Sequence, residues 1–162
     1  MIRMCETYKI NEAKKYIEKV FDSNWISFTG EFVEKCEDEI KNILGVEHVL
    51  LTNSGTSATH CIIKAIKYKR PECNKIYLHN NCYVAAYNMA LEEFNKNNIF
   101  ILPTDENTWN LDLNYLDDIE KNAALVVVHN LGNILNIRKI KKLRPDILIV
   151  EDNCEGFMGR YN

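Results

Sequence analysis

The sequence has 162 residues, 46% of them hydrophobic and 27% charged, which is typical of a globular domain with a core of its own. A formal net charge of -3, and the lack of any segment that mixes lysine and arginine with aromatic residues, argue against a nucleic acid partner. The apolar runs are too short to cross a membrane, the amino terminus lacks the apolar core of a signal peptide, and six scattered cysteines without metal-site spacing are typical of reduced thiols, so we expect a cytoplasmic protein.

The first part of the chain shows a helical pattern. Apolar residues recur at spacings of three and four from Asn11 to Phe21, which predicts a first helix. A loop over residues 25–30 separates it from a second predicted helix, Glu31–Leu44, which Gly45 terminates. We expect residues 1–24 to form a helical arm ahead of the main domain.

Five short runs rich in β-branched and aliphatic residues follow, and helical patterns fill most of the gaps between them. This alternation predicts an α/β fold with a mostly parallel sheet and helices on both faces. In such sheets ligands bind at the carboxyl ends of the strands, where the connecting loops meet. The predicted strands are Val49–Thr52, Lys75–His79, Asn98–Leu102, Ala124–His129 and Ile147–Glu151.

The first predicted strand runs into the polar turn of LLTNSGTSATH, residues 50–60. Ser54, Gly55 and Thr56 would then stand at the N-terminus of a helix, whose unpaired N–H groups can bind an anion such as phosphate. Serine and threonine also cap ordinary helices, and taken alone this second interpretation is the stronger one. The helix is expected to face inward with Ala58, Ile62, Ala65 and Ile66.

Further candidates lie at or just after three other predicted strands. Asp152 and Glu155 are positioned to pair with a cationic ring nitrogen, bind a metal or accept a proton, although a solvated loop acid is the commoner outcome. Tyr83 can lie flat against a planar ligand or pack in the core. His129 can line the cleft or serve only as a hydrogen-bonded residue at a strand end.

Taken in order, these stretches resemble the DegT/StrS-type sugar aminotransferases, pyridoxal phosphate enzymes of fold type I, the aspartate aminotransferase fold. The resemblance implies that residues 25–162 form an incomplete cofactor-binding large domain. The family's Schiff-base lysine lies further along the chain than Asn162, so the resemblance covers an amino-terminal portion and assigns no catalytic residue. It rests on Trp25-Ile26-Ser27, Thr29-Gly30, Leu44-Gly45-Val46 with His48, Asn53–Ala58, Tyr83, Val128–Gly132 and Glu151–Glu155.

The same resemblance implies roles for individual residues. The turn of Ser54, Gly55 and Thr56 would bind the cofactor phosphate, Tyr83 would stack on the pyridine ring, and Asp152 would pair with the ring nitrogen. Glu155 occupies a position near the ring oxygen where glutamine is more usual. The string Glu-Asp-Asn-Cys that contains Asp152 also resembles the related deoxysugar dehydratases, so the branch of the family stays open.

The leading interpretation is therefore an aminotransferase of amino-sugar biosynthesis, which moves an amino group from a donor such as glutamate to a nucleotide-linked keto-sugar. A dehydratase of the same fold and a non-catalytic remnant or interaction subunit are the alternatives. A nicotinamide-binding domain ranks last, because the turn at residues 53–57 holds only one glycine. In the family, two later strands lie between the strand matching residues 49–52 and the strand matching Ile147–Glu151. Without these two strands the sheet has uncovered edges, so we expect pairing with a second copy, as a homodimer, or with a complementing chain.

Overall fold

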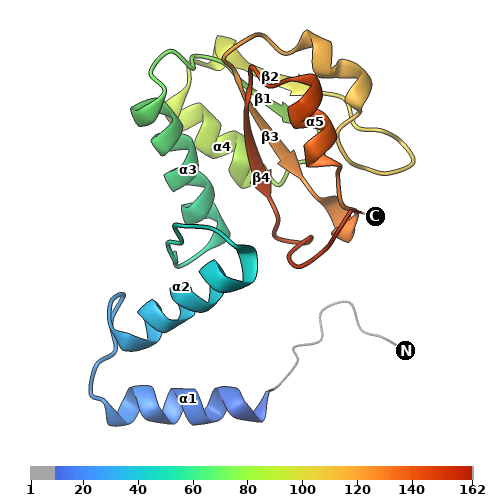
Figure 1. Ribbon diagram of the computed structural model, residues 1–162. Coiled ribbons are helices and arrows are strands. Elements are labelled where there is room, and N and C mark those ends of the chain that lie inside the picture. Colours follow the sequence, from blue (N-terminus) through green and yellow to red (C-terminus); the bar gives the residue numbers. More distant parts are fainter. Residues whose placement is uncertain (1–9, 162) are drawn as a thin grey trace. The chain divides into compact units, whose positions relative to one another are not determined.

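The computed structural model describes residues 10–161, in two compact units that divide between Leu51 and Thr52. The first unit contains α1 (Asn11–Asp22) and α2 (Glu31–Leu44), which match the two helices predicted from the sequence (Figure 1). Gly45 follows α2 with a φ of 65°, the left-handed conformation that glycine adopts at helix ends without a Cβ clash. The proposed division into an arm and an incomplete large domain remains a prediction.

The predicted strand Val49–Thr52 is absent, and this prediction was wrong. The segment belongs to neither a helix nor a strand. The N–H of Leu51 donates instead to the side chain of Glu37, at 2.9 Å. An aliphatic run becomes a strand only where a neighbouring strand pairs with its backbone groups, and within the described residues none does so.

The other four predicted strands are confirmed, with bounds that shift by no more than one residue. They are β1 (Ile76–His79), β2 (Ile99–Leu102), β3 (Ala124–Val128) and β4 (Leu148–Asp152). All pair in parallel, in the order β2-β1-β3-β4, so that β2 and β4 form the two edges of the sheet within the described residues. The predicted parallel α/β architecture is therefore correct.

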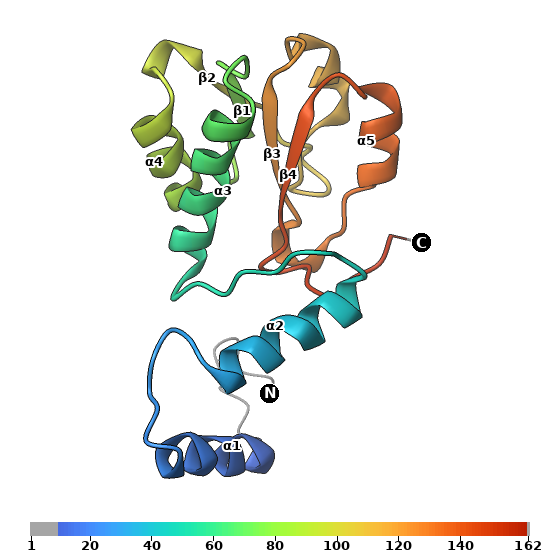
Figure 2. The ribbon, with the colours of Figure 1, turned by 60° about the vertical axis from the view of Figure 1, so that its left-hand side comes forward.

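Helices cover both faces of this sheet, as predicted (Figure 2). On one face lie α3 (Gly55–Lys69) and α4 (Val84–Glu93). On the other lie α5 (Ile137–Leu143) and the 3₁₀ helix η2 (Leu113–Asp118). Two single-turn 3₁₀ helices, η1 and η3, complete the unit at Lys96–Asn98 and Asn130–Gly132. None of the described helices combines the length and apolarity that a membrane crossing requires.

Two apolar clusters fill the space on either side of the sheet, because successive side chains of a strand point to opposite faces. The α3 and α4 side contains Ile63, Ile66, Leu78, Ala90, Phe94 and Val126, and the α5 side contains Tyr77, Leu102, Leu111, Leu125, Val127 and Ile140.

The same alternation orients the end of β4. Leu148 and Val150 pack against the α3 and α4 cluster, whereas Ile149 packs against the α5 cluster. Two residues after Val150, Asp152 therefore projects toward the α3 side, and Glu151 projects toward the α5 side. The strand thus delivers its two terminal carboxylates to opposite faces of the sheet.

The inward face predicted for α3 is partly wrong. The fully buried residues are Ile63 and Ile66, while Ile62 is 43% exposed and Ala65 is also exposed. A change of one position rotates a side chain by about 100° around a helix. Because Ile62 and Ile63 are adjacent isoleucines, hydrophobicity cannot choose between them, and the packing of α3 against Phe94 and Ala90 decides the face.

Candidate functional site

A cavity of about 1100 Å³ opens at the carboxyl ends of β1, β3 and β4, wholly within the second unit. The start of α3, the start of α4 and the ends of β3 and β4 form its walls, and Val126, Val128 and Val150 supply apolar surface. Most of the residues singled out from the sequence line it. They are Gly55, Thr56, Tyr83, Asp152 and Glu155.

The start of α3 lines the cavity and carries N–H groups without a partner in the helix. Ser54 is the N-cap residue, and its Oγ accepts a hydrogen bond from the N–H of Ser57 at 3.2 Å. Ser54 itself does not line the cavity, so its observed contact is the capping one. Gly55 and Thr56 occupy the first two helical positions, where the helix offers no acceptor to the N–H group. A Cβ placed on Gly55 would meet no atom within 4 Å, so the space on that side of Gly55 is open.

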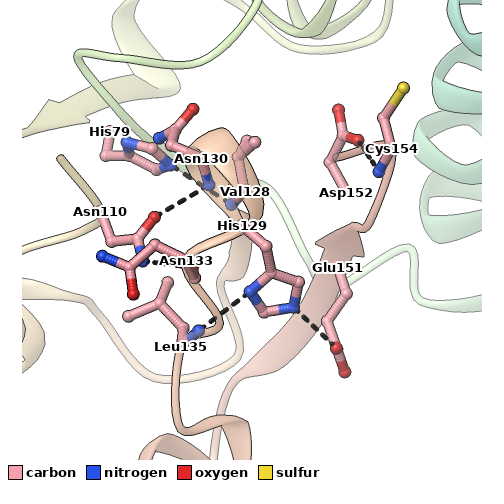
Figure 3. A network of polar contacts seen from close by, with 10 residues as sticks. All are labelled: His79, Asn110, Val128, His129, Asn130, Asn133, Leu135, Glu151, Asp152 and Cys154. Atoms are coloured by element: carbon pink, nitrogen blue, oxygen red, sulfur yellow. Dashed lines mark hydrogen bonds and ion pairs between the residues drawn. The ribbon is translucent and has the colours of Figure 1, made fainter. Parts of the chain in front are cut away.

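Asp152 ends β4 directly beside Val128, its register partner on β3. Its Oδ1 accepts a hydrogen bond from the N–H of Cys154 at 3.1 Å, which fixes the carboxylate relative to the strand (Figure 3). The side chain is half-buried, with aliphatic side chains of β3 and β4 around the cavity wall. A carboxylate held in such surroundings attracts a cationic partner more strongly than one in open solvent.

Tyr83 immediately precedes α4, with an extended backbone and a side chain that is 70% exposed. The alternative interpretation, that this aromatic residue packs in the core, is therefore wrong. Its exposed ring offers a flat apolar face to the cavity, which suits stacking against a planar ligand.

Glu155 connects the segment after β4 to the loop after β3. Its Oε2 accepts a hydrogen bond from the N–H of Leu131 at 2.6 Å. Leu131 has a φ of 54° and is 79% exposed, so this bond holds a residue in the sparsely populated left-handed region. The carboxylate of Glu155 therefore has a structural partner at the cavity wall.

His129 is buried and is not among the residues that line the cavity. Its Nδ1 accepts a hydrogen bond from the N–H of Leu135 at 3.1 Å, so Nε2 carries the hydrogen and donates to Glu151 at 3.3 Å (Figure 3). Nε2 thus joins the end of β3 to β4, and Nδ1 joins it to the segment that leads to α5. The structure thus places His129 as a hydrogen-bonded residue at a strand end.

A second buried histidine, His79, lies at the end of β1. Its Nε2 accepts a hydrogen bond from the N–H of Val128 at 3.3 Å (Figure 3). Its Nδ1 is buried with no hydrogen-bond partner among residues 10–161. Burial disfavours the charged imidazolium and lowers the pKa of His79 to about 4, so the ring is neutral near pH 7.

An asparagine cluster, formed by Asn81, Asn110, Asn130 and Asn133, ties together the loops after β1, β2 and β3. The side chain of Asn110 accepts from the N–H of Asn130 at 3.0 Å and donates to the carbonyl of Asn133 at 2.6 Å (Figure 3). The side-chain amides of Asn130 and Asn81 both donate to the carbonyl of Trp109, at 2.8 and 3.2 Å. These four bonds connect the three loops to one another. Within the described part of the chain, no three His, Cys, Asp or Glu side chains gather to hold a metal ion.

The DegT/DnrJ/EryC1/StrS aminotransferase family model matches residues 7–162. The chain belongs to this family. The resemblance found in the motifs of the sequence is therefore confirmed over nearly the whole chain.

Curated relatives in the DegT family include both aminotransferases and dehydratases. The GDP-perosamine synthase of Escherichia coli O157:H7 is 25% identical over 91% of this chain and 41% of its own length. The GDP-4-keto-6-deoxy-D-mannose 3-dehydratase of Yersinia pseudotuberculosis is 29% identical over 90% of this chain and 38% of its own length. The chain thus spans about 40% of the length of the curated relatives that it matches.

Solved structures of DegT-family enzymes share the fold. A variant of the GDP-4-keto-6-deoxymannose-3-dehydratase ColD with bound GDP-perosamine superposes with a TM-score of 0.82, at 24% identity over 94% of this chain and 41% of that one. The aminotransferase PseC of Helicobacter pylori gives a TM-score of 0.76, at 24% identity over 91% of this chain and 40% of that one. The arrangement of helices and strands in this chain is therefore that of the family.

The DegT family is dependent on pyridoxal phosphate, and an Escherichia coli GDP-4-keto-6-deoxy-D-mannose-3-dehydratase of similar fold has been solved with hydrated pyridoxal phosphate bound. The cavity wall is chemically compatible with this group. The free N–H groups of Gly55 and Thr56 suit a phosphate, the ring of Tyr83 suits a pyridine, and the carboxylate of Asp152 suits a protonated ring nitrogen.

Three features of this site were not predicted from the sequence. The Glu151 contact of His129 could have been found from strand alternation, which sends Glu151 and Asp152 to opposite faces. Trp109 and the asparagine cluster gave no periodic signal, because they lie in loops whose paths depend on one another. The only sequence hint was that Asn81, Asn110 and Asn130 lie in the segments that follow three successive predicted strands.

Proposed function

We propose that this chain forms the cofactor-binding part of an enzyme that transfers an amino group to a nucleotide-linked keto-sugar, with pyridoxal phosphate as the cofactor. The observation that carries the proposal is that one cavity is lined by the start of α3, by Tyr83 and by Asp152. The GDP-perosamine synthases among its relatives, from three organisms, support an amino-sugar product.

Each residue of the cavity wall would have a separate role in holding the cofactor. Pyridoxal phosphate supplies an electron-accepting ring that stabilises negative charge on a carbon of the substrate. The N–H groups of Gly55 and Thr56, at the positive end of α3, would hold the phosphate. Tyr83 would cover one face of the ring and exclude water from it. Asp152 would keep a proton on the ring nitrogen, because an adjacent carboxylate favours the cationic form.

His129 and Glu155 would act through the loop after β3. The two side chains contact the N–H groups of Leu135 and Leu131, at 3.1 and 2.6 Å. They would therefore set the position of this loop at the rim of the cavity, and neither is proposed to touch the cofactor.

The proposed partners are the nucleotide-linked sugar, an amino donor such as glutamate, and a second copy of the chain. Among the described residues of the first unit, 10–51, none is buried. Large apolar side chains in this unit, such as Phe21 and Phe28, are 65% and 89% exposed. Exposed apolar surface of this kind is typical of an interface, and a homodimer is the assembly that we propose.

Binding of pyridoxamine 5′-phosphate to the chain tests the proposal, since this form of the cofactor carries no aldehyde that could react with surface lysines. We expect saturable binding, measured by the cofactor's fluorescence. Asp152→Asn removes the charge-assisted contact to the ring nitrogen and should weaken binding about 10- to 150-fold.

The matched control is Asp118→Asn, the same chemical change at an exposed carboxylate at the end of η2 that does not line the cavity. This variant should bind pyridoxamine 5′-phosphate within about twofold of the unmodified chain. Equal losses in the two variants, or no binding by the unmodified chain, would contradict the proposed site.

A dehydratase of the same fold is the second candidate. It is favoured by relatives that are 28% and 29% identical and carry this activity in their names, and by the sequence Glu151-Asp152-Asn153-Cys154. Incubation of the protein with a nucleotide-linked 4-keto-6-deoxy sugar and glutamate separates the two reactions. An amino sugar supports aminotransfer, whereas a 3-deoxy keto-sugar supports dehydration.

A further inference from the structure

We propose that Trp109 is a stacking surface for the nucleobase of the substrate, an inference that rests on the proposed function and names a residue for the nucleotide. Trp109 lies in the loop between β2 and β3 and lines the same cavity as Tyr83 and Asp152. It is 57% exposed, although tryptophan has the largest apolar surface of any side chain. Trp109 is not among the residues that we assign to cofactor binding.

The backbone of Trp109 is held in an unusual conformation. Its φ is 60°, a value that bulky residues rarely adopt. Its N–H donates to the carbonyl of Asp105 at 2.9 Å, and its own carbonyl accepts from Asn81 and Asn130 at 3.2 and 2.8 Å. A sparsely populated conformation that its surroundings enforce is a frequent mark of a binding site. These hydrogen bonds hold the backbone that carries the indole in place, which reduces the conformational entropy lost when a ligand stacks on the ring.

The size of the cavity leaves room for a ligand besides the cofactor. At about 1100 Å³ it exceeds the range of about 300–1000 Å³ that single small-molecule sites occupy. The cofactor contacts proposed above lie at Gly55, Thr56, Tyr83 and Asp152. The wall formed by Trp109 therefore remains for the substrate.

The chemistry of this wall suits a base better than the other parts of a nucleotide. The described residues that line the cavity include no lysine or arginine, so a diphosphate finds no cationic side chain there. A flat indole matches the flat face of a nucleobase, and such stacking tolerates any base. Asn81 also lines the cavity, and since its Nδ2 donates to Trp109, its Oδ1 is left to accept from an N–H of the base edge.

Intrinsic fluorescence tests the inference directly. The chain has two tryptophans, and Trp25→Phe, a change in the first unit, leaves Trp109 as the only tryptophan, whose emission can be excited selectively over that of tyrosine. In this background GDP should quench the emission of Trp109 saturably, and inorganic pyrophosphate, which lacks a base, should not. Quenching by pyrophosphate to the same extent, or no saturable quenching by GDP, would overturn the proposal.

Affinity measured by calorimetry provides the second arm. Trp109→Ala should weaken GDP binding about 5- to 150-fold, and Trp109→Phe, which keeps an aromatic face, should weaken it less. Tyr68→Ala is the matched control, because Tyr68 is an aromatic residue that is 80% exposed and does not line the cavity. Unchanged GDP affinity in both Trp109 variants would refute the role, and circular dichroism of each variant verifies the fold.

Pyridoxamine 5′-phosphate separates failure of this inference from failure of the proposed function. Trp109→Ala and Asn81→Ala should lower the affinity for GDP while leaving that for pyridoxamine 5′-phosphate within about twofold. A chain that binds pyridoxamine 5′-phosphate but not GDP contradicts only the role of Trp109. A chain that binds neither contradicts both proposals.

Discussion

Acid should destabilise the second unit through His79, the buried histidine at the end of β1. Its side chain is 0% exposed, and burial lowers its pKa from 6.5 to about 4. Protonation in the folded state would place a charge beside the N–H of Val128, which now donates to Nε2. The folded protein therefore binds this proton only in strong acid, whereas the unfolded chain, where the imidazole is solvated, binds it near pH 6.5.

The sign and size of the effect follow from this difference. Between pH 6.5 and pH 4 the unfolded chain holds more protons than the folded one, so the free energy of unfolding falls as the pH falls. A shift of about 2.5 units between the two states corresponds to about 3 kcal/mol once the pH is below 4. Between pH 7 and pH 5 the loss due to His79 should be about 2 kcal/mol.

Urea unfolding, followed by circular dichroism at pH 7 and pH 5, measures this loss. His79→Gln keeps an acceptor for the Val128 N–H and removes the titration, so the variant should lose about 2 kcal/mol less than the unmodified chain over this interval. His48→Gln serves as the control, since the His48 side chain is 89% exposed. If His79→Gln and the unmodified chain lose the same stability between the two pH values, the reasoning is wrong.

Further substitutions test contacts beside the cavity, at Gly156, and at the start of β4, at Arg144. Gly156→Ala would bring a Cβ to 2.6 Å from Asn153 Oδ1 and 2.7 Å from His129 Cβ, so it should lower the free energy of unfolding, measured by thermal unfolding, by about 1–3 kcal/mol. Gly55→Ala is the control, because its Cβ would meet nothing within 4 Å, and it should change this free energy by less than about 0.5 kcal/mol. Equal effects of the two substitutions would show that the space around Gly156 is not crowded. Arg144→Ala removes a guanidinium that donates to the side chain of Asp146 and to two backbone carbonyls, and should cost about 1.5–3 kcal/mol by urea unfolding. Arg144→Lys should recover less than half of that loss, because one ammonium cannot reproduce the forked contacts.

The parallel sheet could be predicted because each of its strands corresponds to a run of aliphatic and β-branched residues in the sequence. A strand covered on both faces needs a continuous aliphatic run, as in Leu125 to Val128, and all five residues of β3 are buried. The carboxyl ends of such strands meet at one edge, so Tyr83 and Asp152 could be expected to line one cavity even though they lie far apart in the sequence.

The remaining features depend on contacts that a local pattern does not contain. Whether residues 49–52 pair as a strand depends on which strands lie beside them, and the choice between Ile62 and Ile63 depends on α4. The conformation of Trp109 is fixed by amides from the loops after β1 and β3, so it follows from tertiary structure. Pairings of this kind become visible only once the loops are placed in space.

The position of β4 at the edge of the sheet has a consequence for the proposed contact between Asp152 and a cofactor. Only β3 pairs with β4 in the described part of the chain, and Asp152 is the last residue of that single pairing. A strand added along the open side of β4 would restrict the motion of this carboxylate and so increase its affinity for a protonated ring nitrogen. By thermodynamic reciprocity, a bound cofactor would then raise the affinity of β4 for the added strand by the same factor. Cofactor binding and pairing of a new strand with β4 would therefore be coupled equilibria.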